Sequence, residues 1–103
     1  MTLPQDLLAR PMEAGDMQAL TELARVCDET YLEWVPRGWM VPIAPRGWAD
    51  RYVAEDAWGR VVHDASGRLV ATTAFRAETA QLAHVGLVFV HPTRWRQGIA
   101  ATL

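Results

Sequence analysis

The residues best suited to chemistry lie in the last stretch, Gln81 to Leu103, which reads QLAHVGLVFVHPTRWRQGIAATL. Its first half is rich in branched apolar side chains and ends at Pro92, which predicts a strand over 82–90 buried on both faces. A polar turn containing Gly98 follows, and the residues after it weakly favour a helix. N–H groups of such a loop have no intrahelical partners, and a helix dipole adds roughly half a positive charge. The stretch therefore predicts a site for the phosphates of a cofactor.

This order of elements resembles a known motif. A hydrophobic strand, then Val90-His91-Pro92, then W-R-Q-G-I-A is similar to motif A of the GNAT family of acyl-CoA N-acyltransferases. That motif ends in Q/R-x-x-G-x-G/A, and Gly98 and Ala100 fill its two small-residue positions. Trp95 departs from the motif at its first position, which removes one polar side chain but leaves the backbone role of the loop intact.

The resemblance implies the transfer of an acetyl group from acetyl-CoA, a co-substrate, to the amine of a small molecule or peptide. In that family the amine attacks the thioester directly, so the protein must position both reactants and move protons. Arg94 and Arg96 either contact phosphate or face solvent. By the resemblance, backbone groups of Val88, Phe89 and Val90 bind pantetheine and the thioester oxygen, and those of Arg96, Gln97, Gly98, Ile99, Ala100 and Ala101 hold the pyrophosphate.

His84 is the side chain expected to act as the catalytic base. It lies six residues before Val90, the strand position where histone-acetylating members of the family carry a catalytic glutamate. A histidine with an ordinary pKa of about 6.5 is mostly neutral at pH 7 and can accept a proton. The alternative is a structural histidine within an apolar strand. His63 and His91 have weaker claims, and the family's usual acid, a tyrosine, has no counterpart because Tyr31 and Tyr52 come too early.

Composition limits the other classes of function. With 103 residues, 50% of them hydrophobic, the chain is one small domain. A net charge of −2 argues against general nucleic-acid binding, although Arg94-Trp95-Arg96 has the residue types that stack on single strands. Cys27 is the single cysteine and the three histidines lack ligand spacing, so no metal site is predicted. No leader or apolar run of membrane-spanning length is evident, and a cytoplasmic location without membrane contact is expected.

The elements that must position these groups follow from periodicity. Strands are expected near 7–10, 60–64, 68–76 and 82–90, with Asp64 to Gly67 as a turn and a second turn at 78–81. A helix near 14–27 carries an apolar stripe that includes Cys27, whose role is core packing. The expected fold class is α+β, an antiparallel meander with the helix on one face, corresponding to strands 1–4 of a GNAT domain.

Residues 31–58 contain an internal repetition. Pro36-Arg37-Gly38-Trp39 recurs as Pro45-Arg46-Gly47-Trp48, and Trp34 and Trp58 flank the pair. Proline and glycine predict turns, with a short helix over 48–55. The segment is either a loop clamped onto the sheet by its tryptophans or, by the resemblance, an aromatic wall of the acceptor pocket.

The resemblance covers residues 1–103 as a partial domain, truncated at the start of the family's third helix. A GNAT domain continues with a fifth strand that forms the other wall of the pantetheine cleft. Strand 82–90 is therefore expected to be an open edge, which invites pairing with a second copy. The alternative to an acetyltransferase is thus an inactive remnant that binds CoA weakly or self-associates through this edge, and the 103-residue chain is expected to lack appreciable activity.

Overall fold

The structure is a computed structural model that describes residues 2–33, 35–36, 57–77 and 79–103, without the side chains of Tyr31, Ala57, Arg76 and 84–87. Most of the tryptophan-rich segment, including the predicted helix 48–55, lies outside the described residues. In chain order the elements are β1 (Leu8–Pro11), η1 (Ala14–Asp16), α1 (Met17–Glu29), η2 (Thr30–Glu33), β2 (Ala57–His63), β3 (Leu69–Ala77), β4 (Ala83–Val90), η5 (Pro92–Arg94) and α2 (Ile99–Thr102).

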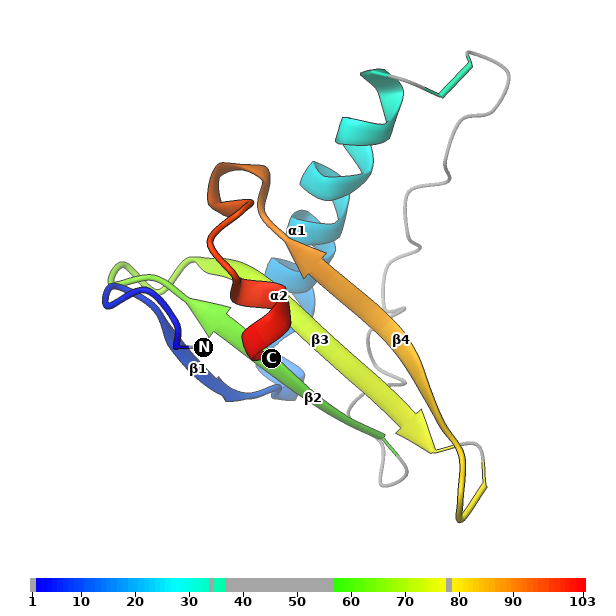
Figure 1. The fold of residues 1–103 in the computed structure, drawn as a ribbon. Helices are drawn as coiled ribbons and strands as arrows, with labels where there is room; N and C mark the ends of the chain where they lie inside the picture. The colour runs from blue at the N-terminus through cyan, green and yellow to red at the C-terminus, as the bar shows by residue number, and fades with distance from the viewer. Residues whose placement is uncertain (1, 34, 37–56, 78) are drawn as a thin grey trace.

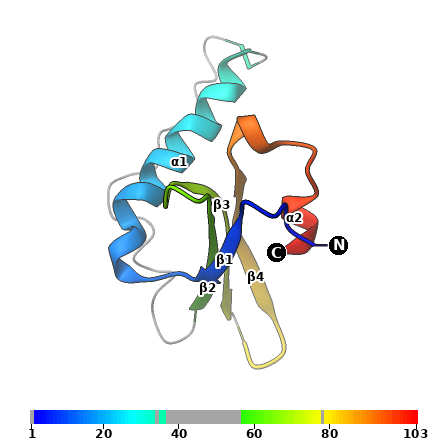
Figure 2. The same ribbon diagram turned by 90° about the vertical axis from the view of Figure 1, so that its left-hand side faces the viewer.

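Within the described residues, four strands form one antiparallel sheet in the order β1-β2-β3-β4, which confirms the predicted meander. Helix α1 crosses one face of the sheet, and α2 lies on the other face beside the N-terminal segment (Figures 1 and 2). The polar turn between β2 and β3 also forms as predicted, with Gly67 at φ +86 and its N–H donating to the Asp64 carbonyl over 3.0 Å.

Side chains on the two faces form two separate clusters. The predicted stripe on α1 is confirmed, since Leu20, Leu23, Ala24 and Cys27 are buried. The cluster under α1 comprises Met12, Leu20, Ala24, Val61, Leu69 and Ala74, and the cluster under α2 comprises Leu7, Val62, Val70, Ala71 and Ile99. The second cluster matters for function, because it fixes the start of α2 against the ends of β3 and β4.

The first two strands differ from the prediction at their ends. β2 begins at Ala57 rather than at residue 60, because Gly59 continues the strand instead of breaking it. A Cβ at Gly59 would lie 2.8 Å from the Met12 Cε atom and 3.2 Å from the Thr73 carbonyl oxygen, so a larger residue there would have to displace the end of the Met12 side chain. Pro11 lies inside β1 rather than after it, which the edge of a sheet tolerates.

The prediction that β4 is buried on both faces is wrong at Val88, whose side chain is 51% exposed. Val88 is opposite Thr73, on the face away from α1, and α2 covers that face only near Val90. β4 is also the last strand in the order of the described sheet, so β3 flanks it on one side. The strand thus reads as apolar in sequence while exposing part of its outer face.

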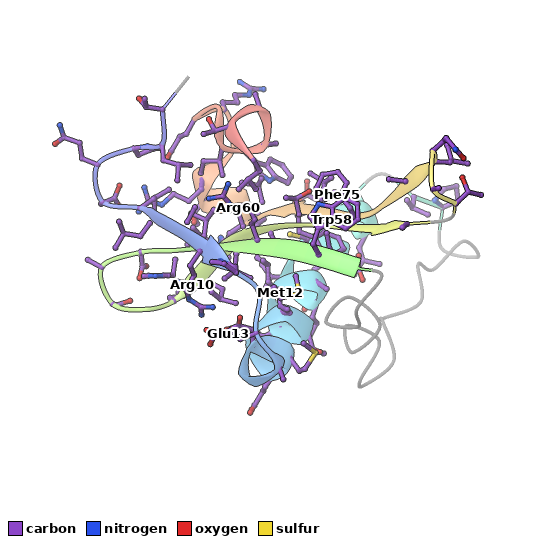
Figure 3. All side chains as sticks on the ribbon, turned by 90° about the horizontal axis from the view of Figure 1, so that it is seen from below. Arg10, Met12, Glu13, Trp58, Arg60 and Phe75 are labelled. Carbon is purple, nitrogen blue, oxygen red and sulfur yellow. The ribbon has the colours of Figure 1, made fainter. Side chains whose placement is uncertain are left out.

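Trp58 and Phe75 form an aromatic pair on the face of the sheet opposite α1. They are cross-strand partners on β2 and β3, with ring centroids 5.5 Å apart and planes inclined by 13°. Figure 3 shows the two rings side by side, with Arg60 projecting to the same side of the sheet. Trp58 stays 50% exposed, so the pair covers part of the sheet without closing it.

Candidate functional site

The segment joining β4 to α2 begins with a turn fixed by hydrogen bonds. The His91 N–H donates to the Val70 carbonyl over 2.7 Å, and the Arg94 N–H donates to the His91 carbonyl over 2.8 Å. Pro92 supplies the fixed φ suited to the first position of η5. This turn directs the chain from the end of β4 back over the face of the sheet that carries α2 (Figure 1).

Two residues of the following loop have left-handed backbones. Gly98, the N-cap of α2, has φ 74 and ψ 14, which glycine adopts without steric cost. Arg96 has φ 64, a conformation that is uncommon for a residue with a long side chain. Such conformations persist where the surrounding structure determines them, and they are concentrated at ligand-binding sites. With four residues, α2 offers free N–H groups at its start but little summed dipole.

An open pocket of ≈ 430 Å³ lies against this loop. Its floor includes Ile99, which is buried, and one wall is Trp95, which is 51% exposed. Of the six loop residues predicted to hold a pyrophosphate, all but Gln97 line the pocket. The lining residues are Val90, Arg94, Trp95, Arg96, Gly98, Ile99, Ala100 and Ala101.

The two arginines of the loop differ in their surroundings. Arg94 forms an ion pair with Asp6 of the N-terminal segment, and it lies 3.4 Å from the Gln97 Oε1 atom. The guanidinium of Arg94 holds the pKa of the Asp6 carboxyl below its usual range. Arg96 is exposed and lines the pocket. Of the two, Arg96 is the better placed to meet an anion, because Arg94 already carries a carboxylate partner.

The pairing of β4 separates the three residues predicted to bind pantetheine. The hydrogen bond from His91 to Val70 extends the register in which Val90 faces Ala71 and Phe89 faces Thr72. Because alternate residues of an antiparallel strand turn their polar groups toward a given neighbour, those of Phe89 face β3. The N–H and C=O groups of Val88 and Val90 face away from β3, along the open edge.

The Val90 carbonyl has two side-chain donors that the sequence did not reveal. The Trp95 indole Nε1 donates to it over 2.7 Å, and the Cys27 Sγ atom lies 3.3 Å away. Burial raises the pKa of the Cys27 thiol to about 11, so the sulfur stays protonated near pH 7 and acts as a donor. Cys27 is therefore a core residue, as predicted, and Trp95 restores a polar contact at the position where the motif departs.

His91 is a second feature that sequence reasoning undervalued. It is 7% exposed, and its Nε2 atom lies 2.6 Å from Nη2 of Arg68. Its Nδ1 atom lies 2.8 Å from the Thr93 hydroxyl and 3.2 Å from the Thr93 N–H group. Burial and the neighbouring guanidinium lower the pKa of His91. A neutral, fully bonded histidine is a poor candidate for a base but a good anchor for the turn.

The catalytic role of His84 stays a prediction. The backbone of His84, in β4, pairs with Arg76 of β3, and the His84 side chain lies outside the described part of the structure. His63 contacts the Asp64 carbonyl through Nδ1 at 3.0 Å, on the strand farther from the pocket. Within the described residues, no three histidine, cysteine or acidic side chains come close enough together to hold a metal ion. No helix in the described ranges is long and apolar enough to span a bilayer.

Residues 17–103 match the sequence profile of the acetyltransferase (GNAT) family. No curated protein matches the chain significantly over its sequence.

Solved structures share the fold. The ribosomal-protein-S18-alanine N-acetyltransferase from Escherichia coli superposes with a TM-score of 0.70 at 15% identity, over 94% of this chain and 54% of that one. The PaiA N-acetyltransferase from Thermoplasma acidophilum, solved with coenzyme A, superposes with a TM-score of 0.67 at 18% identity, over 94% of this chain and 66% of that one. A GNAT-family acetyltransferase from Staphylococcus aureus superposes with a TM-score of 0.72 at 10% identity, over 94% of this chain and 61% of that one. The chain thus spans between about half and two-thirds of the length of these structures.

Proposed function

This chain belongs to the acetyltransferase (GNAT) family, and from that membership we propose that residues 1–103 are part of an N-acetyltransferase domain that binds acetyl-CoA. The observation that carries the proposal is the loop from Arg96 to Ala101, which combines two left-handed residues with an adjoining pocket at the end of β4. The solved relative that contains coenzyme A has the same fold, which supports an acyl-CoA as the donor.

The loop suits phosphate because its backbone can approach a ligand closely. Gly98 has no Cβ, so an oxygen of the pyrophosphate can reach the N–H groups that follow it. Arg96 would add a charge-assisted hydrogen bond from the lining of the pocket. Arg94 would contribute only by giving up Asp6, which is a cost to binding.

The open edge of β4 suits the pantetheine arm. An extended chain with amide groups can pair with a strand edge as an added strand does. Val88 and Val90 present their backbone groups on that side of β4, although Trp95 and Cys27 already engage the Val90 carbonyl. We therefore assign the first contact with the arm to Val88, with Val90 contributing its N–H group.

The reaction needs an amine brought to the thioester carbonyl of acetyl-CoA. Positioning both reactants supplies about 7–11 kcal/mol of the barrier to such a reaction. A base removes the proton of the ammonium, the freed amine nitrogen attacks the carbonyl carbon to form the amide bond, and the carbon–sulfur bond breaks to release the CoA thiolate, which takes up a proton. We assign the base to His84, where such a group contributes roughly 10²–10⁴-fold. The acceptor is an amine of a small molecule or a peptide.

Calorimetry with coenzyme A tests the donor site directly. The chain should bind coenzyme A with release of heat, and acetyl-CoA should compete for the same site. Release of free thiol from acetyl-CoA in the presence of amine acceptors then distinguishes a transferase from the inactive alternative, which would bind coenzyme A without releasing thiol. Absence of coenzyme A binding at millimolar concentrations would overturn the proposal.

A second candidate is association of two copies through β4. The outward-facing groups of Val88 and Val90 and the exposure of Val88 favour it, because an edge of this kind can pair with another strand. Sedimentation across a range of concentrations distinguishes the two. A monomer that binds coenzyme A supports the enzyme, and a dimer that does not bind it supports association.

A further inference from the structure

His91 lies at the junction of β4 and the loop. One ring nitrogen contacts Arg68, 23 residues away in sequence, and the other contacts Thr93 in its own turn. Its backbone carbonyl accepts the Arg94 N–H and its backbone N–H donates to Val70. A single buried residue therefore ties the start of the loop both to the sheet and to the side chain that follows the β2–β3 turn.

The chemistry of the contacts fixes the form of the ring. The Thr93 N–H donates to Nδ1 of His91 over 3.2 Å, and the Arg68 guanidinium, which is always a donor, lies 2.6 Å from Nε2. The Thr93 hydroxyl, 2.8 Å from Nδ1, can donate or accept. An imidazolium would turn an N–H toward a donor at both nitrogens, whereas a neutral ring keeps one nitrogen able to accept. The arrangement therefore requires the neutral ring.

The loop beyond this turn needs such an anchor. Arg96 holds a left-handed backbone that its side chain does not favour, and it lies two residues after η5. A conformation of this kind persists only where neighbouring contacts over-determine it. His91 is the buried N-cap of η5, so its contacts, together with the bond from Trp95 Nε1 to the Val90 carbonyl, set the direction in which the chain enters Trp95 and Arg96.

We propose that His91, in its neutral form, is a positioning residue that holds the Arg96–Ala101 loop in the geometry that binds the phosphates of coenzyme A. The proposal rests on the proposed function of that loop. The residue does not touch the cofactor, since it faces a separate hollow lined by α1 and the β2–β3 turn rather than the pocket at Trp95. It acts through the backbone that it anchors.

The proposal makes binding sensitive to acid. Protonation would place an imidazolium beside the Arg68 guanidinium and leave no ring nitrogen able to accept a hydrogen bond. Glu22 of α1 lines the same hollow, but it forms an ion pair with Arg25 on its own helix. Because Glu22 is already paired with Arg25, it does not neutralise Arg68, and the Arg68 guanidinium repels the charged ring. Acidification below the ordinary histidine pKa of 6.5 should release the turn and weaken binding.

Three variants of the full 103-residue chain separate positioning from bulk packing. His91→Phe keeps the ring volume but removes both polar contacts. His91→Gln keeps an acceptor for Arg68, and His91→Asn keeps a polar group near Thr93. His63→Phe is the matched control, because it removes a histidine that contacts the Asp64 carbonyl rather than the loop.

The first readout is hydrogen exchange without ligand at the amides of Thr93, Arg94 and Trp95. These amides lie 3.2 Å from His91 Nδ1, 2.8 Å from the His91 carbonyl and 3.4 Å from the Pro92 carbonyl, respectively. His91→Phe should speed their exchange roughly tenfold or more while leaving amides of β2 unchanged. His91→Gln and His91→Asn should each fall between the wild type and His91→Phe, and His63→Phe should match the wild type.

The second readout is the dissociation constant for coenzyme A by calorimetry at pH 7.5 and pH 5.5. Binding by the wild type should weaken roughly tenfold at the lower pH, and His91→Gln should bind with a flatter pH profile. Unchanged loop exchange in His91→Phe would overturn the inference, whatever the binding result. If His91→Phe does not fold, His91→Gln and His91→Asn carry the same test. Failure of every protein to bind coenzyme A would refute the function of the loop and leave the exchange data to decide the role of His91.

Discussion

Two junctions of this molecule, one between β1 and α1 and one between β4 and α2, use polar groups in opposite ways. At the first, the Asp16 carboxylate accepts two bonds from Arg10, at 2.7 and 2.8 Å, and a third from the Glu13 N–H at 2.8 Å. Asp16 is 7% exposed, so nearly every acceptor site of a buried charge is used within the protein. At the second, Arg96 is strained and exposed, and the loop borders an open pocket.

The difference separates scaffold from site. A satisfied buried ion pair resists change because removal of one partner leaves the other charge uncompensated. An exposed loop with left-handed residues contributes little to stability but offers backbone groups to a ligand. Substitutions at the first junction should therefore alter the free energy of unfolding, and those at the second should alter the affinity for coenzyme A.

The largest effect is expected at Gly98. Gly98→Val should weaken binding of coenzyme A at least 100-fold, because a branched side chain blocks close approach and resists a φ of 74. Gly67→Val is the matched control, since Gly67 has a similar φ of +86 and a Cβ there would meet nothing within 4 Å, but it lies in the β2–β3 turn. Calorimetry should show normal binding for the control. Equal loss in both variants would mean that backbone strain alone explains the effect.

The second effect is expected at Asp16. Asp16→Asn should lower the free energy of unfolding by about 2–3 kcal/mol, because it breaks a bidentate pair whose carboxylate is buried. Urea denaturation measures the change, and the affinity of the folded variant for coenzyme A should remain that of the wild type. Glu22→Gln is the control, since it removes an exposed carboxylate paired with Arg25 and should change stability far less. A comparable loss in the two variants would remove the distinction between buried and exposed pairs.

The sequence predicted the scaffold better than the contacts that position the site. Periodicity was sufficient for α1 and for the meander, because a stripe on a helix and alternation on strands are local patterns. Periodicity failed to predict the start of β2 near Gly59 and the exposure of Val88. Close packing against Met12 and the partial cover of β4 depend on distant parts of the chain.

The site divides in the same way. The motif located the loop from Arg96 to Ala101 correctly beside a pocket, because its residues are contiguous. Partners far apart in sequence were missed: Asp6 for Arg94 and Cys27 for the Val90 carbonyl. Side-chain contacts across 63 or 88 residues leave no periodic signal in a single sequence.

A third prediction concerns acid. The hydrogen bonds from Arg10 hold the pKa of Asp16 below its ordinary value of 3.8, so the unfolded chain takes up this proton first as the pH falls. The contribution of Asp16 is fully present above pH 3.8 and is lost as the pH falls through the lowered value. His91 also has a lowered pKa, so its contribution is present above pH 6.5 and declines below it.

The two junctions should therefore lose stability in separate pH ranges. The free energy of unfolding of the wild type should exceed that of Asp16→Asn by an amount that shrinks only when the pH falls below about 4. The excess of the wild type over His91→Gln in the free energy of unfolding should shrink below pH 6.5. A single common range in both comparisons would contradict the assignment of the two groups.

The smallest effect is expected at Trp95, where the two roles meet. Its indole N–H donates to the Val90 carbonyl over 2.7 Å while its ring forms a wall of the pocket. Trp95→Phe removes the donor and keeps an aromatic wall, which leaves the Cys27 thiol as a partner of that carbonyl at 3.3 Å. A neutral hydrogen bond of this kind contributes about 0.5–1.5 kcal/mol, and partial compensation by the thiol places the loss at the lower end.

Affinity for coenzyme A should change less than about fivefold in Trp95→Phe, since about 1 kcal/mol corresponds to that factor. Trp95→Gln restores a donor but removes the wall, so it distinguishes the two contributions. Recovery of stability without recovery of affinity would assign the hydrogen bond to the scaffold and the ring to the site. Trp58→Phe serves as the control, because it keeps an aromatic ring beside Phe75 on another part of the sheet. A loss of affinity in Trp95→Phe as large as that in Gly98→Val would show that the indole, rather than the loop backbone, holds the cofactor.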